Sequence, residues 1–237
     1  MGILIFSAAV FLGAFIQSVS GFGFGIFVML IFPFILPVSE CAAVSGLLSM
    51  VSSFALGFYL RKKCNFKRIL FPILGYIIGS LPAILISDST SNDFMKKVLA
   101  VILIVLSLYF LLFQSKLRIR ESLPTALAVG FFSGILGGFF AMGGPPIVAY
   151  LIQTSKDNDS YMAEVQMYFG ITNLISSIIR AIGGIITVSV LCNWGIGLVA
   201  LFLGTVLGRK IFKYIDSKRL KLIVYCFMLV SGVINLF

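Results

Sequence analysis

The sequence predicts an all-α, polytopic membrane protein of two inverted repeats, and three observations lead to this fold class. First, 60% of the 237 residues are hydrophobic and only 11% are charged, whereas a soluble domain carries about 25% charged residues. Second, apolar runs recur along the whole chain. Third, polar and glycine positions of the first half return in the same order in the second half. We therefore expect a single transmembrane domain over residues 1–237.

The chain contains about eight apolar segments, each bounded by polar or charged residues. They are 3–36, 41–60, 69–87, 98–113, 122–154, 165–190, 193–208 and 222–237. Since about 20 helical residues cross the hydrocarbon core, most of these segments fit one crossing. The first and the fifth are too long for that, and both have glycines or prolines near the middle. We expect both to be broken into hairpins of short helices; the alternative is one tilted helix with an interfacial extension.

The charges of the loops favour the hairpins. The loop at 61–68 has five basic and no acidic residues, the loop at 209–221 has six basic and one acidic, and the loop at 116–121 has three basic and one acidic. Single crossings would place the two most basic loops on opposite faces, whereas basic loops normally stay on the cytoplasmic face. With hairpins all three share one face, and only the acidic loop at 154–164 fits poorly. We therefore expect a multi-pass protein of the cell inner membrane with both termini on the non-cytoplasmic side.

An internal repeat relates the two halves of the chain, 1–115 and 121–237. A distance of 124 residues relates Glu40, Gly46, Ser52 and Ser53 to Glu164, Gly170, Ser176 and Ser177. A distance of 129 residues relates Gly75 and Gly79 to Gly204 and Gly208, which implies a small insertion near 181–193. With the hairpins, each half makes an odd number of crossings, so the halves lie inverted in the membrane. Inverted repeats with broken helices are an architecture of secondary transporters.

The two breaks carry the residues that predict a binding site. They read Gln17-Ser18-Val19-Ser20-Gly21-Phe22-Gly23-Phe24-Gly25 and Gly137-Gly138-Phe139-Phe140-Ala141-Met142-Gly143-Gly144-Pro145-Pro146. Backbone that leaves a helix cannot face lipid, so it must line a buried or wet cavity. The N–H groups at the start of each half-helix favour an anion. We predict substrate binding at Gln17, Ser20, Gly21, Gly23, Gly25, Gly143, Gly144 and Pro145; the alternative is close helix packing through small residues.

The segment 165–190 adds three candidate ligands. Arg180 is the only charged residue deep inside it, and an isolated buried cation costs several kcal/mol, which marks it as a functional candidate. A guanidinium can bind an oxyanion or a carboxylate through two hydrogen bonds. The alternatives are that Arg180 reaches the interface or pairs with a glutamate. Asn173 and Ser177 are four residues apart and share a helix face, which we expect to line the pathway or to bond neighbouring helices.

Two glutamates are candidate proton-coupling groups. Glu40 and Glu164 are expected to open equivalent helices of the two halves, with Ser39 as a cap for the first. A half-buried carboxylate can take up a proton and so couple transport to a proton gradient. The simpler interpretation is a favourable negative charge at a helix N-terminus.

The breaks also carry a resemblance to a known family. Ser20-Gly21-Phe22-Gly23-Phe24-Gly25 and Gly143-Gly144-Pro145-Pro146 resemble the breaks of the TauE/SafE sulfite exporter family, and the duplicated layout and chain length fit over nearly the whole sequence. Phe24 stands where the family often has a run of glycines. The resemblance implies a membrane permease, with members linked to export of sulfite or organosulfur anions.

Composition excludes several other functions. The chain has no histidine, and its four cysteines stand far apart, so we expect no metal site, no cofactor and no enzymatic activity. The net charge of +10 lies in short loops, which indicates membrane topology and no nucleic-acid partner. We expect a secondary transporter that exports a small, sulfur-containing anion by alternating access. Its partners are the anion and the lipid bilayer, and a homo-oligomer stays open. The alternatives are a permease that depends on a separate ATPase and an intramembrane enzyme.

Overall fold

The computed structural model describes residues 2–112, 119–211 and 217–234, apart from the side chains at 20, 110, 112, 217–224 and 227. All of its regular secondary structure is helical, which confirms the all-α class. The α-helices are α1 (Gly2–Ser20), α2 (Phe24–Val28), α3 (Val38–Tyr59), α4 (Phe66–Ser89), α5 (Asn92–Leu112), α6 (Leu123–Phe140), α7 (Gly144–Thr154), α8 (Asn158–Ile182), α9 (Val188–Ile211) and α10 (Ser217–Ile234). Two short 3₁₀ helices are η1 (Phe32–Phe34) and η2 (Arg61–Lys63).

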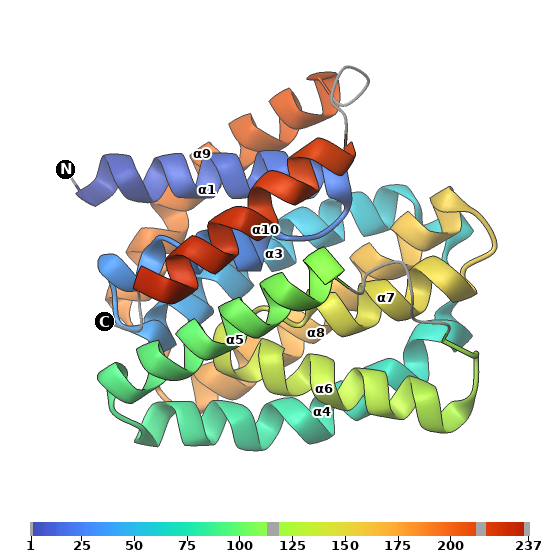
Figure 1. Ribbon diagram of the computed structural model, residues 1–237, viewed down its shortest axis with the longest axis horizontal. Helices are drawn as coiled ribbons and strands as arrows, with labels where there is room; N and C mark the ends of the chain where they lie inside the picture. Colours follow the sequence, from blue (N-terminus) through green and yellow to red (C-terminus); the bar gives the residue numbers. More distant parts are fainter. Residues whose placement is uncertain (1, 113–118, 212–216, 235–237) are drawn as a thin grey trace.

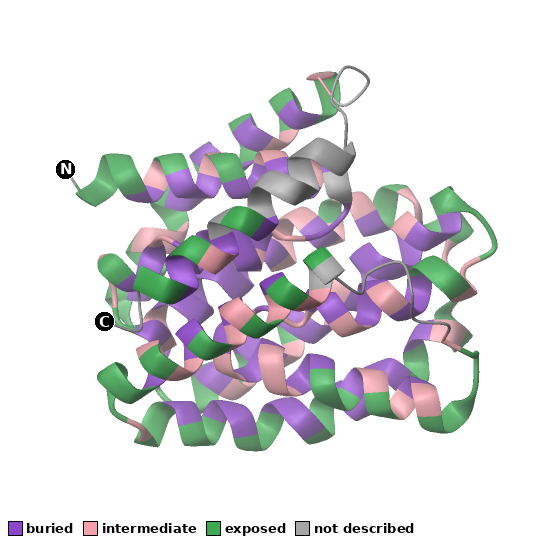
Figure 2. Cartoon of the chain, viewed as in Figure 1, coloured by how far each residue is buried: buried purple, intermediate pink, exposed green. Residues whose placement is uncertain are grey.

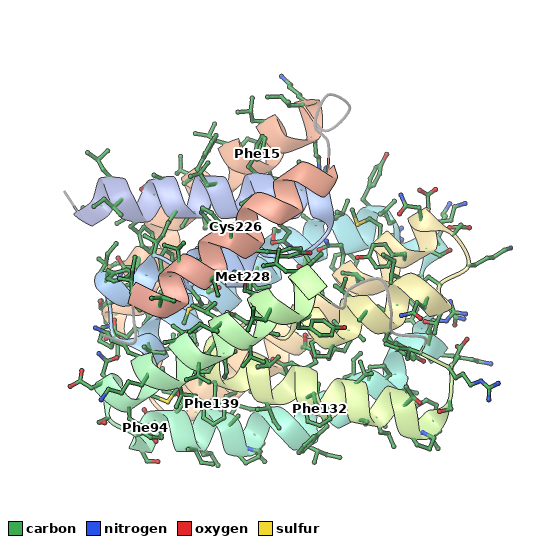
Figure 3. All side chains as sticks on the ribbon, viewed as in Figure 1. Phe15, Phe94, Phe132, Phe139, Cys226 and Met228 are labelled. Carbon is green, nitrogen blue, oxygen red and sulfur yellow. The ribbon has the colours of Figure 1, made fainter. Side chains whose placement is uncertain are left out.

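The surface of the helix bundle is largely apolar. Within the described ranges, five helices are long and apolar enough to cross a membrane, namely α1, α3, α4, α6 and α9. Large side chains such as Phe94 of α5 and Phe132 of α6 lie on the outside, where more than half of each is exposed (Figure 3). The buried residues gather towards the middle of the bundle (Figure 2). Such an outer surface suits lipid, so the chain is a multi-pass membrane protein, while the count of eight segments stays a prediction.

Both long apolar segments are broken where the sequence places the breakers. In segment 3–36 helix α1 stops at Ser20 and α2 starts at Phe24. In segment 122–154 helix α6 stops at Phe140 and α7 starts at Gly144. The expected hairpins of short helices are wrong in one respect, because α1 has 19 residues and α6 has 18, and only α2 and α7 are short, with 5 and 11. The glycines inside α1 and α6 do not end these helices, so the first arm of each grows to the length of a full crossing.

The arrangement of the helices places particular connections on particular faces. In Figure 1 helix α1 begins, and α10 ends, at the left edge of the bundle. The connection between α3 and α4 lies at the opposite edge, as does the connection between α7 and α8. The structure describes the basic loops at 116–121 and 209–221 only in part. Which face lies in the cytoplasm therefore stays a prediction.

Side-chain caps explain where three of the long helices begin. Asn65 accepts a hydrogen bond from the Lys67 amide at the start of α4, and Ser122 accepts one from the Thr125 amide at the start of α6. Asp157 accepts from the Ser160 amide at 2.8 Å at the start of α8. Hydrogen bonds from the backbone amide and the hydroxyl of Ser160 lower the pKa of the Asp157 carboxyl below its usual value. Each cap satisfies a backbone donor that the helix itself leaves free.

Ser39 is not the cap of α3, contrary to the expectation. The residue before α3 is Pro37. The first amide of α3, that of Val38, donates to Asn92 Oδ1 at 2.9 Å. Proline suits this position because its fixed φ matches the entry into a helix. Glu40 does lie in the first turn of α3 and is half-buried.

Pairs of glycines let the two halves approach each other closely. A Cβ atom on Gly75 or Gly79 of α4 would overlap the carbonyl oxygen of Leu127 or Phe131 of α6. In the same way, a Cβ on Gly204 of α9 would overlap the Phe11 carbonyl of α1. The glycine pairs that the sequence repeat relates therefore make the same kind of contact. Each packs the fourth helix of its own half against the first helix of the other half.

An ion-pair network ties α4 to α8 near one end of the bundle. Arg68 Nη1 lies 2.9 Å from Glu164 Oε1, and Arg68 Nε lies 3.1 Å from Glu121 Oε1. The hydroxyl of Ser155 donates to the other oxygen of Glu164, whose side chain is fully buried. The expectation that Glu164 opens its helix is wrong, because the Asp157 cap starts α8 at Asn158 and places Glu164 in the second turn. Its role in proton coupling stays a prediction.

Gly79→Ala should destabilise the protein by about 1–3 kcal/mol, because the added methyl group forces the backbones of α4 and α6 apart. Thermal denaturation of the purified protein in detergent measures this change. Gly195→Ala is the matched control, since no heavy atom lies within 4 Å of a Cβ there, and alanine favours a helix. Equal melting temperatures for the two variants would show that the α4–α6 contact does not need glycine.

Glu164→Gln should lower the thermal stability far more than Glu121→Gln. Loss of one partner of a buried ion pair costs about 3–5 kcal/mol, whereas an exposed pair contributes less than about 1 kcal/mol. Both variants remove one carboxylate from the same arginine, so each is the other's control. A larger effect of Glu121→Gln would contradict the assignment of Glu164 as the main partner of Arg68.

Candidate functional site

The two helix breaks contact each other in the middle of the bundle. A Cβ on Gly25, at the start of α2, would overlap the carbonyl oxygen of Ala141 in the second break. In a second contact, Phe22 of the first break lies 3.6 Å from where a Cβ atom on Gly144 of the second break would be. Segments that are about 120 residues apart in the sequence thus form one structure. Only a residue without a side chain, such as Gly25, lets the two backbones approach this closely.

The backbone of each break needs unusual torsion angles. Gly21 and Gly23 have φ values of 81° and 101°, and Ala141 has a φ of 53°. Positive φ is favourable for glycine and costly for other residues. The strain at Ala141 is held in place by its own amide, which donates to the Gly137 carbonyl at 2.9 Å.

Buried side chains satisfy the carbonyl groups that the breaks release from helical bonding. Gln166 Nε2 donates to the Gly21 carbonyl at 2.7 Å. The hydroxyl of Ser133 donates to the Gly143 carbonyl and accepts a bond from the Tyr168 hydroxyl at 2.9 Å. Arg180 Nη2 donates to the Gly138 carbonyl at 2.6 Å. These contacts fix the breaks and remove the cost of unpaired backbone groups inside a membrane.

A small polar cavity lies between the breaks and helices α3, α4, α6 and α8. The polar side chains that line it are those of Gln17, Ser49, Tyr76, Ser133, Tyr168, Thr172 and Asn173. The rings of Phe22, Phe24 and Phe169 form apolar walls. The space open to the centres of water molecules is about 30 Å³, which suffices for a few waters. No charged side chain is among the lining residues that the structure describes.

The structure brings six of the predicted ligands together at this cavity. They are Gln17, Gly23, Gly25, Gly143, Gly144 and Asn173. The side chain of Ser20 lies outside the described residues. The other four candidates do not line the cavity: Gly21, Pro145, Ser177 and Arg180. Gly21 instead presents its carbonyl to Gln166, and Pro145 occupies the first turn of α7.

Arg180 has a backbone partner that the sequence did not predict. Its side chain is only 3% exposed, so it does not reach the membrane interface. In the described part of the chain it forms no ion pair, and both ion pairs there belong to Arg68. Its guanidinium bonds the last carbonyls of α6, where the helix dipole favours a cation. Contact between Arg180 and a bound anion stays a prediction.

The half-helices offer an anion fewer N–H groups than the sequence suggested. Pro145 and Pro146 occupy the first turn of α7 and have no amide hydrogen. Helix α2 has only five residues, too few for a strong dipole. The donors at the cavity are therefore mainly side chains. Asn173 Nδ2, for example, has two hydrogens and uses one on Ser49 Oγ at 3.2 Å.

Five polar lining residues escaped the sequence-based prediction, namely Ser49, Tyr76, Ser133, Tyr168 and Thr172. Ser49 could have been found, because it precedes Asn173 by the repeat distance of 124 residues. Tyr76 follows the first of the paired glycines in α4, a weaker signal. Ser133 and Tyr168 lie in ordinary helical sequence that gives no signal. Glu40 and Glu164 do not line the cavity, and no three His, Cys, Asp or Glu residues of the described ranges could hold a metal ion.

Comparison with known proteins places this architecture in a family. The model of the sulfite exporter TauE/SafE family matches residues 5–234. A curated protein of Cupriavidus necator, named a probable sulfite/organosulfonate exporter TauE, is 22% identical over 203 residues, which cover 84% of this chain and 79% of that protein. No solved structure matches the chain. Because the family model spans almost the whole sequence, the chain belongs to the sulfite exporter TauE/SafE family, whose members are membrane transporters and not enzymes.

Proposed function

We propose that this protein is a secondary transporter that exports a small sulfur-containing anion, such as sulfite or an organosulfonate, from the cell by alternating access. The observation that carries the proposal is the contact between the two helix breaks, which encloses a polar cavity. Family membership supports transport, and the name of the Cupriavidus necator relative supports a sulfur anion as the solute.

The chemistry of the cavity suits a small oxyanion. Hydroxyl and amide groups converge from several helices, and such neutral donors bind the oxygens of an anion without a fixed opposite charge. The small space favours a compact solute over a bulky one. A neutral site also releases its ligand more easily than a site with a buried cation, which is a requirement for turnover.

The packing of the helices supports inverted halves that alternate. Helix α4 packs on α6 as α9 packs on α1, while α3 packs on α8 and α5 on α10. Helices α3 and α5 thus each contact their own counterpart in the other half. Helices α4 and α9, which are counterparts, each contact the first helix of the other half. Ser49 and Asn173, which are one repeat distance apart, touch each other. Such a contact is expected at a twofold axis between the halves, and inverted halves can exchange conformations to open on either face.

The termini are proposed to lie outside the cytoplasm. The connection between α3 and α4 carries Arg61, Lys62 and Lys63, all exposed, at the face opposite the start of α1. Basic connections favour the cytoplasmic side. The cell inner membrane is the corresponding location for an exporter of this kind.

Gly144→Leu should abolish transport and leave the protein folded. The glycine lines the cavity and has no atom closer than 3.5 Å to a Cβ, so a leucine fills the cavity without striking the backbone. Uptake of radiolabelled sulfite by proteoliposomes, with neither ATP nor a partner protein, measures the activity. Gly195→Leu on the open face of α9 is the control. The proposal fails if the unmodified protein moves no sulfur anion, or if Gly144→Leu transports normally.

Asn173→Leu should weaken sulfite binding about tenfold, because one hydrogen bond to an anion contributes about 1.5 kcal/mol. Leucine keeps nearly the same volume, so the melting temperature should change little. Isothermal titration calorimetry gives the dissociation constant. Ser107→Ala, which removes a hydroxyl bonded to the Tyr225 carbonyl between α5 and α10, controls for loss of a buried polar group elsewhere. Unchanged affinity in Asn173→Leu would exclude this amide as a ligand.

A further inference from the structure

A second cavity lies next to the central one and shares one residue with it. We call it the vestibule; its polar lining consists of Gln17, Ser18, Ser52, Gln166, Thr205 and Arg209. These residues come from α1, α3, α8 and α9, so both halves contribute to it. The space open to the centres of water molecules is about 20 Å³. Hydroxyls and amides around such a space can hold water.

One side chain lines both cavities. Gln17 lines both of them and is only 6% exposed. Its Nε2 atom donates to Ser53 Oγ at 3.3 Å and to Gln166 Oε1 at 3.5 Å, both at the long end of the hydrogen-bond range. Its Oε1 atom is buried and has no partner among the described residues. A side chain held this loosely can rotate at little cost, so it is a weak barrier.

The barrier is connected to the first helix break. Gln166, which accepts the bond from Gln17, donates with its other end to the Gly21 carbonyl at 2.7 Å. Gly21 has positive φ, and a Cβ atom added to it would lie 2.8 Å from Met162 Sδ of α8. Any movement of the break relative to α8 therefore changes the support of Gln17. The barrier can respond to the same rearrangement that remodels the central cavity.

The vestibule has a positive mouth. Arg209 lies exposed in the last turn of α9 and is the one charged residue of the lining that the structure describes. Helix α9 runs from the left of the view and ends at its top (Figure 1). No carboxylate of the described residues lines the vestibule to offset this charge. A cation at the entrance of a narrow polar passage raises the local concentration of anions.

We propose that the vestibule is an anion-selective passage to the central cavity, with Arg209 as the selecting charge at its mouth and Gln17 as the gate at its inner end. The identity of the solute rests on the proposed function, whereas the existence and the charge preference of the passage do not. The passage is therefore tested without any measurement of transport.

The charge preference can be measured with a cysteine at Ser52. The background replaces Cys64, Cys192 and Cys226 with serine and keeps Cys41, which is buried. The thiolate of Ser52→Cys attacks a methanethiosulfonate reagent, so that a mixed disulfide forms and methanesulfinate leaves. The sulfonatoethyl reagent is an anion and the trimethylammonium-ethyl reagent is a cation of similar size. We expect the ratio of the anionic to the cationic rate to fall about fivefold when Arg209→Gln is added.

Lys210→Gln is the matched control for the charge. It removes one positive charge from the next residue, which is exposed and does not line the vestibule. We expect it to leave the rate ratio within about a factor of two of the background. Equal effects of Arg209→Gln and Lys210→Gln would show a general field of the basic face and overturn the role of Arg209. If Ser52→Cys resists both reagents, no passage exists.

The gate can be measured with a cysteine at Ser49, which lines the central cavity and is buried. Modification of Ser49→Cys by the anionic reagent should be slow with Gln17 present and about tenfold faster with Gln17→Ala. Gln17→Leu keeps the bulk of the side chain and should stay slow. Melting temperatures of all variants establish that each is folded. Equal rates for Gln17 and Gln17→Ala would overturn the gate, and an absence of sulfite transport would overturn the proposed function while leaving these rates unchanged.

Discussion

The contact between Gly25 and the carbonyl of Ala141 is the constraint on which the interior of this protein depends. Two breaks from different halves of the chain can lie against each other only because Gly25 has no side chain where it meets the backbone of Ala141. The backbone released from helical bonding would be unstable against lipid. It is stable here because each break shields the other and because Gln166, Ser133 and Arg180 bond the released carbonyls. The polar cavity is the space that this arrangement leaves.

The charged side chains of the described residues lie away from the central cavity. The cavity itself is lined by neutral groups, whereas Arg209 stands at the mouth of the neighbouring vestibule. Arg180, in the last turn of α8, bonds the backbone of α6. Arg68 bonds two glutamates at the end of the bundle. A fixed cation in contact with the solute would hold an anion tightly and slow its release, whereas a cation at the entrance increases the rate of encounter.

The glycine pairs give the two halves similar interfaces. Gly75 and Gly79 bring α4 onto α6, and Gly204 brings α9 onto α1, in each case with a glycine against a backbone carbonyl. A glycine interface has a smooth surface, so sliding meets a lower barrier than at an interface of interdigitated side chains. Hydrogen bonds between side chains also join the halves at the centre, among them Asn173–Ser49, Tyr76–Ser176 and Gln17–Gln166. Glycine contacts and buried hydrogen bonds together hold the two halves against each other.

The sequence by itself determined the membrane class, the helical content and the positions of both breaks, because hydrophobic composition and glycine torsions act locally. The repeat distance also related glycine pairs that make equivalent contacts. Only the tertiary structure decided that Arg180 bonds the Gly138 carbonyl, that Tyr76 and Tyr168 face the cavity, and that Gln17 stands between two cavities. These features depend on how each helix is rotated about its axis and where it crosses its neighbours. A mostly apolar helix has no strong polar face to fix that rotation, so packing against distant parts of the chain sets it.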